Sequence, residues 1–174
     1  NGYSSDDGDY ISGNMYFYLN YFQIDLVDYE EITLPDGTTE RRAYNKVDFP
    51  RYYDYDLFFF DAVEEARRQK KNIAVLKARR KGYSYKIAAM LLLNYYLVKG
   101  SKGYAFAGEK EFLVGDGILT KCWDAMDFID QNTAWYKKRD KKNTEMHKIA
   151  SFVTTDETGV PIELGYKSEV MGVS

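Results

Sequence analysis

The feature that most constrains the fold is a stretch near the middle of the chain, where an apolar run leads through a basic turn into an apolar helix. The run is Ile73 to Leu76, and the turn contains Gly82. The helix is expected from Tyr85 to Val98, and it should be buried because it is apolar nearly all round. A short, continuous apolar run is typical of a central parallel strand that is covered on both faces. A strand that enters a helix through such a turn brings backbone N–H groups and the helix N-terminus to one point, and this geometry binds phosphate.

The turn matches the phosphate-loop pattern Gly-x-x-x-x-Gly-Lys-Ser/Thr only in part. Ala78 stands at the first glycine, Gly82 at the second and Tyr83 at the lysine, while Ser84 occupies the place of the metal-binding hydroxyl. Ser84 is therefore a candidate Mg²⁺ ligand, and its alternative role is a helix cap. Gly82 can take a positive φ and let a phosphate approach the backbone, or it is a simple loop glycine.

The lysine that is missing at Tyr83 leaves open which cation would face the phosphates. Basic residues occur at Lys77, Arg79, Arg80 and Lys81. An arginine can bridge two phosphate oxygens, so Arg79 is the first candidate and Lys77, at the end of the expected strand, is the second. Such a cation would stabilise the charge that accumulates on the β- and γ-phosphates during transfer. For each of these residues the alternative is a solvated loop cation.

Residues 1–48 are predicted to form an N-terminal extension with a β-hairpin. Residues 15–27 are apolar and aromatic, and we expect them to be a strand or a buried extended segment. The pair Asp36-Gly37 is a strong turn signal, and it predicts a hairpin that joins strands over residues 31–34 and 39–44.

Residues 49–174 are predicted to form an α/β domain. Asp54 is expected to cap a helix over residues 55–69, which has an apolar face, and residues 104–108 read as a strand. A strand, a helix and a strand within about 35 residues form a βαβ unit, which favours a parallel sheet. The remaining expected elements are a helix over residues 109–131, loosened near Gly115 and Gly117, and strands over residues 148–154 and 161–173.

The charge of the chain is segregated, although its net value is only −3. No Asp or Glu lies between Glu65 and Glu109, so the basic turn can form a positive patch where an anion binds. A second cluster over residues 135–142 combines cations with Trp and Tyr rings, which suits nucleic-acid contact, or it is a solvated linker. No apolar run is long enough to span a bilayer, so we expect no membrane partner.

The residues Ala78-Arg79-Arg80-Lys81-Gly82-Tyr83-Ser84, after an apolar run, resemble the deviant phosphate loop of the large terminase subunits of tailed bacteriophages. These subunits are the ATP-driven motors that package DNA. In that family a basic residue near the start of the loop often replaces the lysine, and the resemblance gives this role to Arg79. The family also carries an adenine-contacting segment, often Arg-x-Tyr-Gln, and Arg51-Tyr52-Tyr53-Asp54 is similar to it. Tyr53 would stack on the base, and Asp54 stands where the glutamine is expected.

The resemblance implies a P-loop NTPase-like, mostly parallel sheet with flanking helices, and ATP with Mg²⁺ as cofactors. It implies double-stranded DNA, a portal protein and a small terminase subunit as partners, a homo-oligomeric ring, and the host cell cytoplasm as the place of action. Residues 162–174 resemble the region before the family's acidic strand, but no apolar run followed by Asp-Glu occurs. We therefore expect that strand beyond Ser174, and a fragment with little or no ATP hydrolysis of its own. An arginine acting on a neighbouring subunit's nucleotide is not identified, and Arg80 and Arg139 are only guesses.

Two other functions are compatible with the same residues. The chain can be a different P-loop protein, such as a helicase-like or kinase-like domain, because the strand, turn and helix are common to them. It can also be a binding module that recognises nucleic acid or protein through the basic turn and the tyrosines, without a nucleotide.

Overall fold

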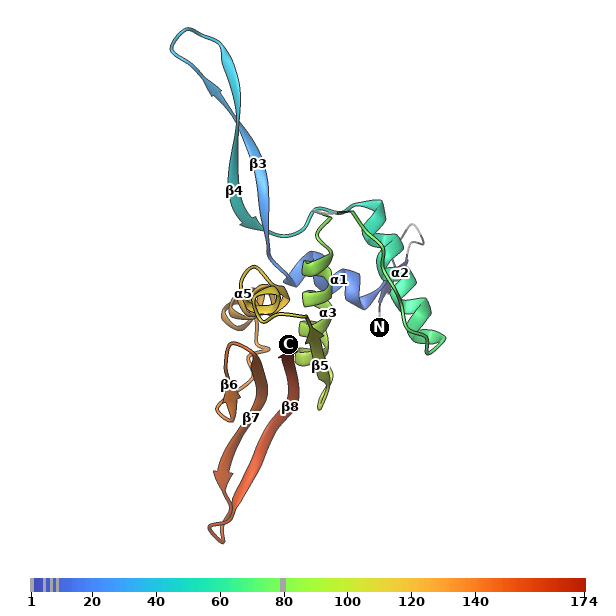
Figure 1. Ribbon diagram of the computed structural model, residues 1–174, viewed down its shortest axis with the longest axis vertical. Coiled ribbons are helices and arrows are strands. Elements are labelled where there is room, and N and C mark those ends of the chain that lie inside the picture. The colour runs from blue at the N-terminus through green and yellow to red at the C-terminus, as the bar shows by residue number, and fades with distance from the viewer. Residues whose placement is uncertain (1, 5, 7, 9, 79–80) are drawn as a thin grey trace.

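The computed structural model describes residues 2–4, 6, 8, 10–78 and 81–174. Figure 1 shows that they form a central body from which two β-hairpin arms project in opposite directions. The helices and strands, in chain order, are β1 (Tyr3–Ser4), β2 (Tyr10–Ile11), α1 (Gly13–Tyr21), β3 (Ile24–Thr33), β4 (Thr39–Asp48), α2 (Asp54–Arg68), α3 (Tyr83–Leu97), β5 (Lys102–Phe106), α4 (Glu111–Val114), α5 (Ile118–Asn132), β6 (Lys142–Asn143), β7 (His147–Thr155) and β8 (Pro161–Val173).

The strands of the described residues lie in separate small sheets. β1 pairs with β2 and β3 pairs with β4, in both cases antiparallel. The third sheet has the order β5-β8-β7-β6, with β5 parallel to β8 and the other pairs antiparallel. The chain is therefore a mixed α/β protein, as predicted. The expected mostly parallel sheet is not what these residues form, because β5–β8 is their one parallel pair.

The central strand predicted over Ile73–Leu76 is wrong. These residues belong to no strand, and their side chains are exposed, that of Leu76 completely. In Figure 1 the chain returns along α2 in this region and then enters α3. A strand needs a neighbour for its backbone N–H and C=O groups, and within the described residues β5 pairs with β8 instead. The predicted βαβ unit is wrong for the same reason.

The strand predicted over residues 15–27 is wrong in its first part, which is helix α1. The Ser12 hydroxyl oxygen accepts a hydrogen bond from the Met15 backbone N–H at 3.3 Å and caps this helix. The hairpin is confirmed and is longer than expected, because β3 and β4 pair from Ile24 and Asp48 to the turn at residues 34–38. Gly37 has a φ of 82° there, which a glycine adopts without strain.

The core is built around α3, which packs against α1, α5, β5 and β8. Ala88, Ala89, Leu92 and Tyr95 on its inner face are completely buried. The helix was predicted to be buried nearly all round, but Leu97 is 48% exposed on its outer side. The expected elements after α3 are present, since α4 and α5 are separated at residues 115–117, and β7 and β8 form a hairpin. The short strands β1, β2 and β6 were not predicted.

Replacing Leu92 with alanine tests the position of the core. We expect Leu92→Ala to lower the free energy of unfolding by about 2–5 kcal/mol, because it leaves a cavity in a closed core. Leu97→Ala on the same helix is the matched control, and it should change that free energy by less than about 0.5 kcal/mol. Urea unfolding followed by circular dichroism measures both, and equal losses would contradict the burial described here.

Candidate functional site

A cavity of about 370 Å³ lies where the N-terminus of α3 meets the start of α2 and the base of β3. We call it the α3 pocket. Its lining residues come from α1, β3, the connector before α2, the first turn of α2, the turn that opens α3 and the first turn of α3. They are Tyr18, Ile24, Asp25, Leu26, Val27, Pro50, Arg51, Tyr53, Tyr55, Asp56, Lys81, Gly82, Tyr85 and Lys86.

Gly82 opens α3 in a left-handed conformation, with φ 68° and ψ 11°. It is the N-cap residue, and among the described residues no side chain forms a capping hydrogen bond at this end of the helix. The first backbone N–H groups of any helix lack partners within the helix, and they carry its positive dipole end. The start of α3 therefore offers donors at the edge of the α3 pocket. The alternative role of Ser84 as the cap is wrong, because Ser84 lies inside the first helical turn.

A buried ion pair lies directly beneath this turn. The Lys86 Nζ is 2.7 Å from Asp56 Oδ1, and it also donates a hydrogen bond to the backbone oxygen of Lys81 at 2.9 Å. The two side chains are only 1% and 2% exposed. The ammonium group lies over the rings of Tyr83, Tyr55 and Tyr18, at 4.5, 5.0 and 5.8 Å from their centroids. Burial lowers the pKa of Lys86, and the bond to Asp56 opposes this shift.

The opposite side of the α3 pocket is aromatic. The rings of Tyr53 and Tyr55 are stacked, with centroids 5.1 Å apart and an interplanar angle of 8°. Arg51 forms an ion pair with Asp28 at 3.0 Å, which ties the connector to β3. The ammonium of Lys46, the Tyr29 backbone N–H and Arg51 together lower the pKa of Asp28 to about 2. The cap predicted at Asp54 is wrong by one residue, because Tyr53 is the N-cap and Asp54 begins the helix.

The structure brings some of the predicted site residues together and leaves others apart. Tyr53, Lys81 and Gly82 line the α3 pocket. Lys77 and Ala78 are exposed on the segment before the turn, Tyr83 packs its ring edge-on against Phe59 at 5.1 Å, and Ser84 is half-buried without lining the pocket. Arg79 and Arg80 lie outside the described residues.

Lys86 and Asp56 were missed by the sequence reasoning. The signal was present, because Lys86 is the only charged residue in the segment from Tyr85 to Val98, which was predicted to be a buried helix. A lysine in such a helix requires a counter-charge. The sequence does not indicate which carboxylate supplies it.

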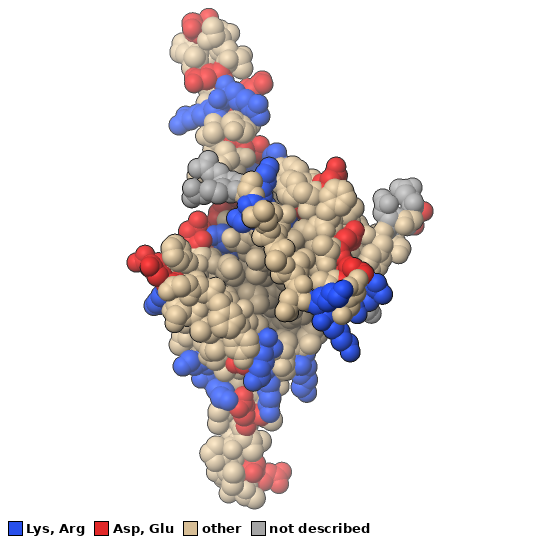
Figure 2. All heavy atoms as spheres, turned by 45° about the vertical axis from the view of Figure 1, so that its right-hand side comes forward, with Lys and Arg blue, Asp and Glu red and all other residues tan. Residues whose placement is uncertain are grey.

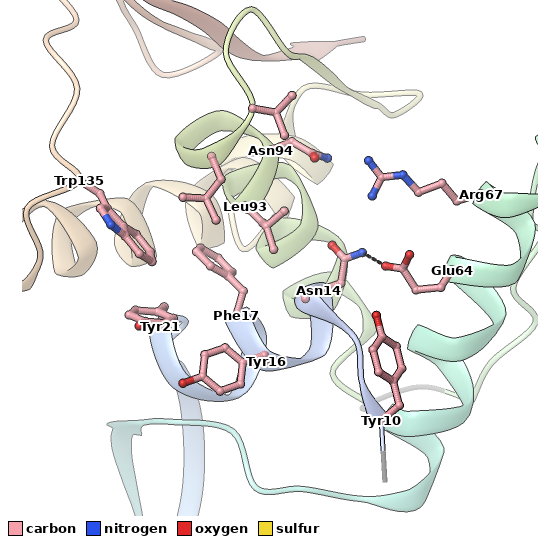
Figure 3. Close-up of a pocket in the computed structure, with 13 residues that line it drawn as sticks. Tyr10, Asn14, Tyr16, Phe17, Tyr21, Glu64, Arg67, Leu93, Asn94 and Trp135 are labelled. Atoms are coloured by element: carbon pink, nitrogen blue, oxygen red, sulfur yellow. Dashed lines mark hydrogen bonds between the residues drawn. The ribbon is translucent and has the colours of Figure 1, made fainter. Parts of the chain in front are cut away.

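A second cavity, of about 670 Å³, lies between α1, α2 and α3 (Figure 3). Phe17, Tyr21 and Trp135 form one wall, and the Trp135 ring is stacked on Phe17 at 6.3 Å with an angle of 11°. On the other side Asn14 donates a hydrogen bond to Glu64 at 2.6 Å, and Arg67 extends from α2 toward the cavity. Trp135 therefore packs into the body and is not an exposed stacking platform.

Most of the basic cluster over residues 137–141 is engaged within the protein. Figure 2 shows Lys and Arg side chains gathered at the lower end of the body, near the arm formed by β7 and β8. Lys137 and Lys138 lie over the rings of Tyr166 and Phe152, each at 4.4 Å, and Lys141 pairs with Glu163. Arg139 forms a buried ion pair with Asp130. Within this chain Arg139 is thus engaged by Asp130, and its action on a neighbouring subunit's nucleotide stays a guess.

No helix among the described residues is long and apolar enough to cross a membrane. In the same part of the chain, no group of three or more His, Cys, Asp or Glu side chains is arranged to hold a metal ion. Comparison of the chain with protein-family models, curated proteins and solved structures finds no match.

Replacing Gly82 tests the conformation of the turn. Its added Cβ would meet only the Lys86 Nζ and the Tyr18 hydroxyl, both at 3.7 Å, so the cost of Gly82→Ala comes from the backbone. We expect it to lower the free energy of unfolding by about 1–2 kcal/mol, because an alanine is strained at positive φ. Gly108→Ala, where no positive φ is required and the surrounding space is open, is the control. Equal effects of the two variants in urea unfolding would contradict a left-handed Gly82.

Proposed function

We propose that the α3 pocket binds a nucleoside triphosphate with its magnesium ion. We further propose that the chain is the nucleotide-binding part of a P-loop NTPase-like motor of the terminase type, which packages viral DNA into procapsids. One observation carries the proposal. Residues from two segments that the resemblance assigns to the same nucleotide, Arg51 and Tyr53 from one and Lys81 and Gly82 from the other, line the same pocket although the segments are far apart in the sequence.

The phosphate end of the ligand would lie at the start of α3. The uncapped N–H groups of the first turn favour an anion, and the left-handed Gly82 removes the Cβ that would stand between backbone and phosphate. Lys81 lies beside this turn, with its ammonium 5.6 Å from the centroid of the Tyr55 ring. Its charge is available at the place where the missing lysine of the loop would act.

The base would lie against the tyrosines. A planar base can stack on an aromatic ring, and Tyr53 is nearly half exposed at the α3 pocket. Arg51 is fixed by Asp28 and stands beside it. The volume of about 370 Å³ lies within the usual range for small-ligand sites.

Hydrolysis of the nucleotide would need groups besides those described here. The two carboxylates that line the α3 pocket are already engaged, since Asp56 pairs with Lys86 and Asp25 accepts a hydrogen bond from the Tyr85 hydroxyl at 2.8 Å. We therefore propose that these residues bind ATP, and that ATP hydrolysis coupled to DNA movement belongs to the whole motor. Its proposed setting is the host cytoplasm, in a ring with a portal protein, a small terminase subunit and double-stranded DNA.

The exposed segment Ile73–Leu76 does not support the P-loop fold, and the proposal rests on the α3 pocket instead. A helicase-like P-loop protein would use the same pocket, so the nucleotide site does not separate it from a packaging motor. The nucleic-acid module without a nucleotide receives less support, because Trp135 and most of the cations near it are engaged by neighbouring side chains.

Calorimetric titration with MgATP and with adenosine tests the pocket. We expect Lys81→Ala to weaken MgATP binding by about 1.5–3 kcal/mol and to leave adenosine binding unchanged, because it removes a charged partner of the phosphates. Tyr53→Ala should weaken binding of both ligands by about 1–3 kcal/mol through lost stacking. Tyr52→Ala and Lys99→Ala, which are exposed and do not line the pocket, are the controls. Absence of MgATP binding by the unaltered chain would refute the proposal.

The magnesium role of Ser84 is tested by titrating ATP with and without the metal. We expect Ser84→Ala to weaken binding in the presence of Mg²⁺ more than in the presence of a chelator, because the hydroxyl would contact the ion and not the phosphates. An equal loss in both titrations would assign Ser84 to the packing of the first turn of α3.

A further inference from the structure

The ion pair between Lys86 and Asp56 connects the two sides of the α3 pocket. Asp56 lies in the first turn of α2, close to Tyr53 and Tyr55, and Lys86 lies in the first turn of α3. The Lys86 ammonium group bonds to both the Asp56 carboxylate and the backbone oxygen of Lys81. Through one buried cation, the turn that opens α3 is thus fastened to the helix that carries the aromatic side.

Stability alone does not explain this pair. Apolar residues of similar volume often stabilise a core as well as a buried ion pair does, because removing two charges from water is costly. What an apolar pair cannot provide is a donor to the Lys81 oxygen. That hydrogen bond holds the residue immediately before Gly82 and therefore constrains the left-handed turn.

Lys86 does not itself reach a ligand in this arrangement. Its side chain is 1% exposed, and its ammonium group is engaged by the ion pair with Asp56 and by the hydrogen bond that it donates to the Lys81 oxygen. Turning the ammonium group toward a phosphate would leave the Asp56 carboxylate buried without a partner, which is strongly unfavourable. Any effect of Lys86 on a ligand must therefore pass through the turn.

We propose that Lys86 and Asp56 are positioning residues that set the preference of the α3 pocket for a nucleoside triphosphate over the bare nucleoside. They do so by holding residues 81–83 in the conformation that directs the free N–H groups of α3 at the phosphates. This inference rests on the proposed function, since it concerns the same pocket and its ligand.

The test uses the double variant Asp56→Leu/Lys86→Met, which removes both charges at once. Lys86→Met alone would leave a buried carboxylate unpaired, and its effects would mix misfolding with loss of positioning. Lys121→Met is the matched control, because Lys121 is also a buried lysine whose ammonium donates to a backbone oxygen five residues earlier, that of Asp116, and it does not line the pocket. Asp56→Asn is a second variant that removes the negative charge but keeps the side-chain volume and leaves an amide oxygen that can accept from the Lys86 ammonium.

Thermal unfolding, calorimetry with MgATP and adenosine, and amide hydrogen exchange are measured on each variant. We expect the double variant to keep the thermal midpoint within a few degrees, and the ratio of MgATP to adenosine affinity to fall about tenfold, the effect of about one charged hydrogen bond. The amides of residues 82–85 should exchange faster in the unliganded chain. Asp56→Asn should change the ratio and the exchange in the same direction by less, and Lys121→Met should change neither.

The outcomes separate the inference from the function on which it rests. If the double variant keeps both the affinity ratio and the exchange rates of the unaltered chain, the positioning role is refuted while the nucleotide site stands. If the unaltered chain binds neither MgATP nor adenosine, both the proposed function and the inferred preference for the triphosphate are refuted. Faster exchange confined to residues 82–85 would still show in that case that the ion pair holds the turn.

Discussion

The structure depends on the burial of one face of α3. This helix contacts α1, α5, β5 and β8, so the elements of the body pack on it from several sides. Two adjacent alanines, Ala88 and Ala89, leave room for close approach, and Leu92 and Tyr95 fill the space further along. A buried polar group also contacts this helix: the Ser168 hydroxyl donates a hydrogen bond to the backbone oxygen of Tyr95 at 2.5 Å. A helix held in this way cannot shift without opening the core.

The candidate site takes its rigidity from that burial. The N-terminus of α3 opens into the pocket, while the rest of the helix is anchored by packing, so the N–H groups at its start keep one direction. The aromatic side has a different support. Arg51 is joined to Asp28, and Asp28 in turn to Lys46 at 3.0 Å, so the connector is fastened to the base of the β3–β4 arm by surface ion pairs. Such pairs are individually weak and are screened by salt.

Features set by local chemistry were predictable from the sequence. The Asp36-Gly37 turn predicted the hairpin that β3 and β4 form, and the glycines at 115 and 117 indicated the break between α4 and α5. Features set by distant partners were not. The run Ile73–Leu76 has the composition of a central strand, but pairing depends on which strand lies beside it, and β5 pairs with β8. The helix at Gly13–Tyr21 was missed because its aromatic residues are typical of a strand, whereas in the structure Ser12 caps a helix there.

The candidate site also contains some features that local sequence predicts and others that depend on distant partners. Gly82 and Ser84 could be placed at a helix start from their spacing alone, Lys81 was named as a cation of the basic turn, and Tyr53 was named through a resemblance. The partner of Lys86 could not be predicted, because Asp56 lies on another helix and the sequence around Asp56 does not indicate that it is buried. That pair fastens the start of α3 to α2 and thereby sets the distance between the tyrosines and the turn. The α3 pocket is lined by two separately recognisable segments, and its geometry therefore depends on a contact that neither segment encodes by itself.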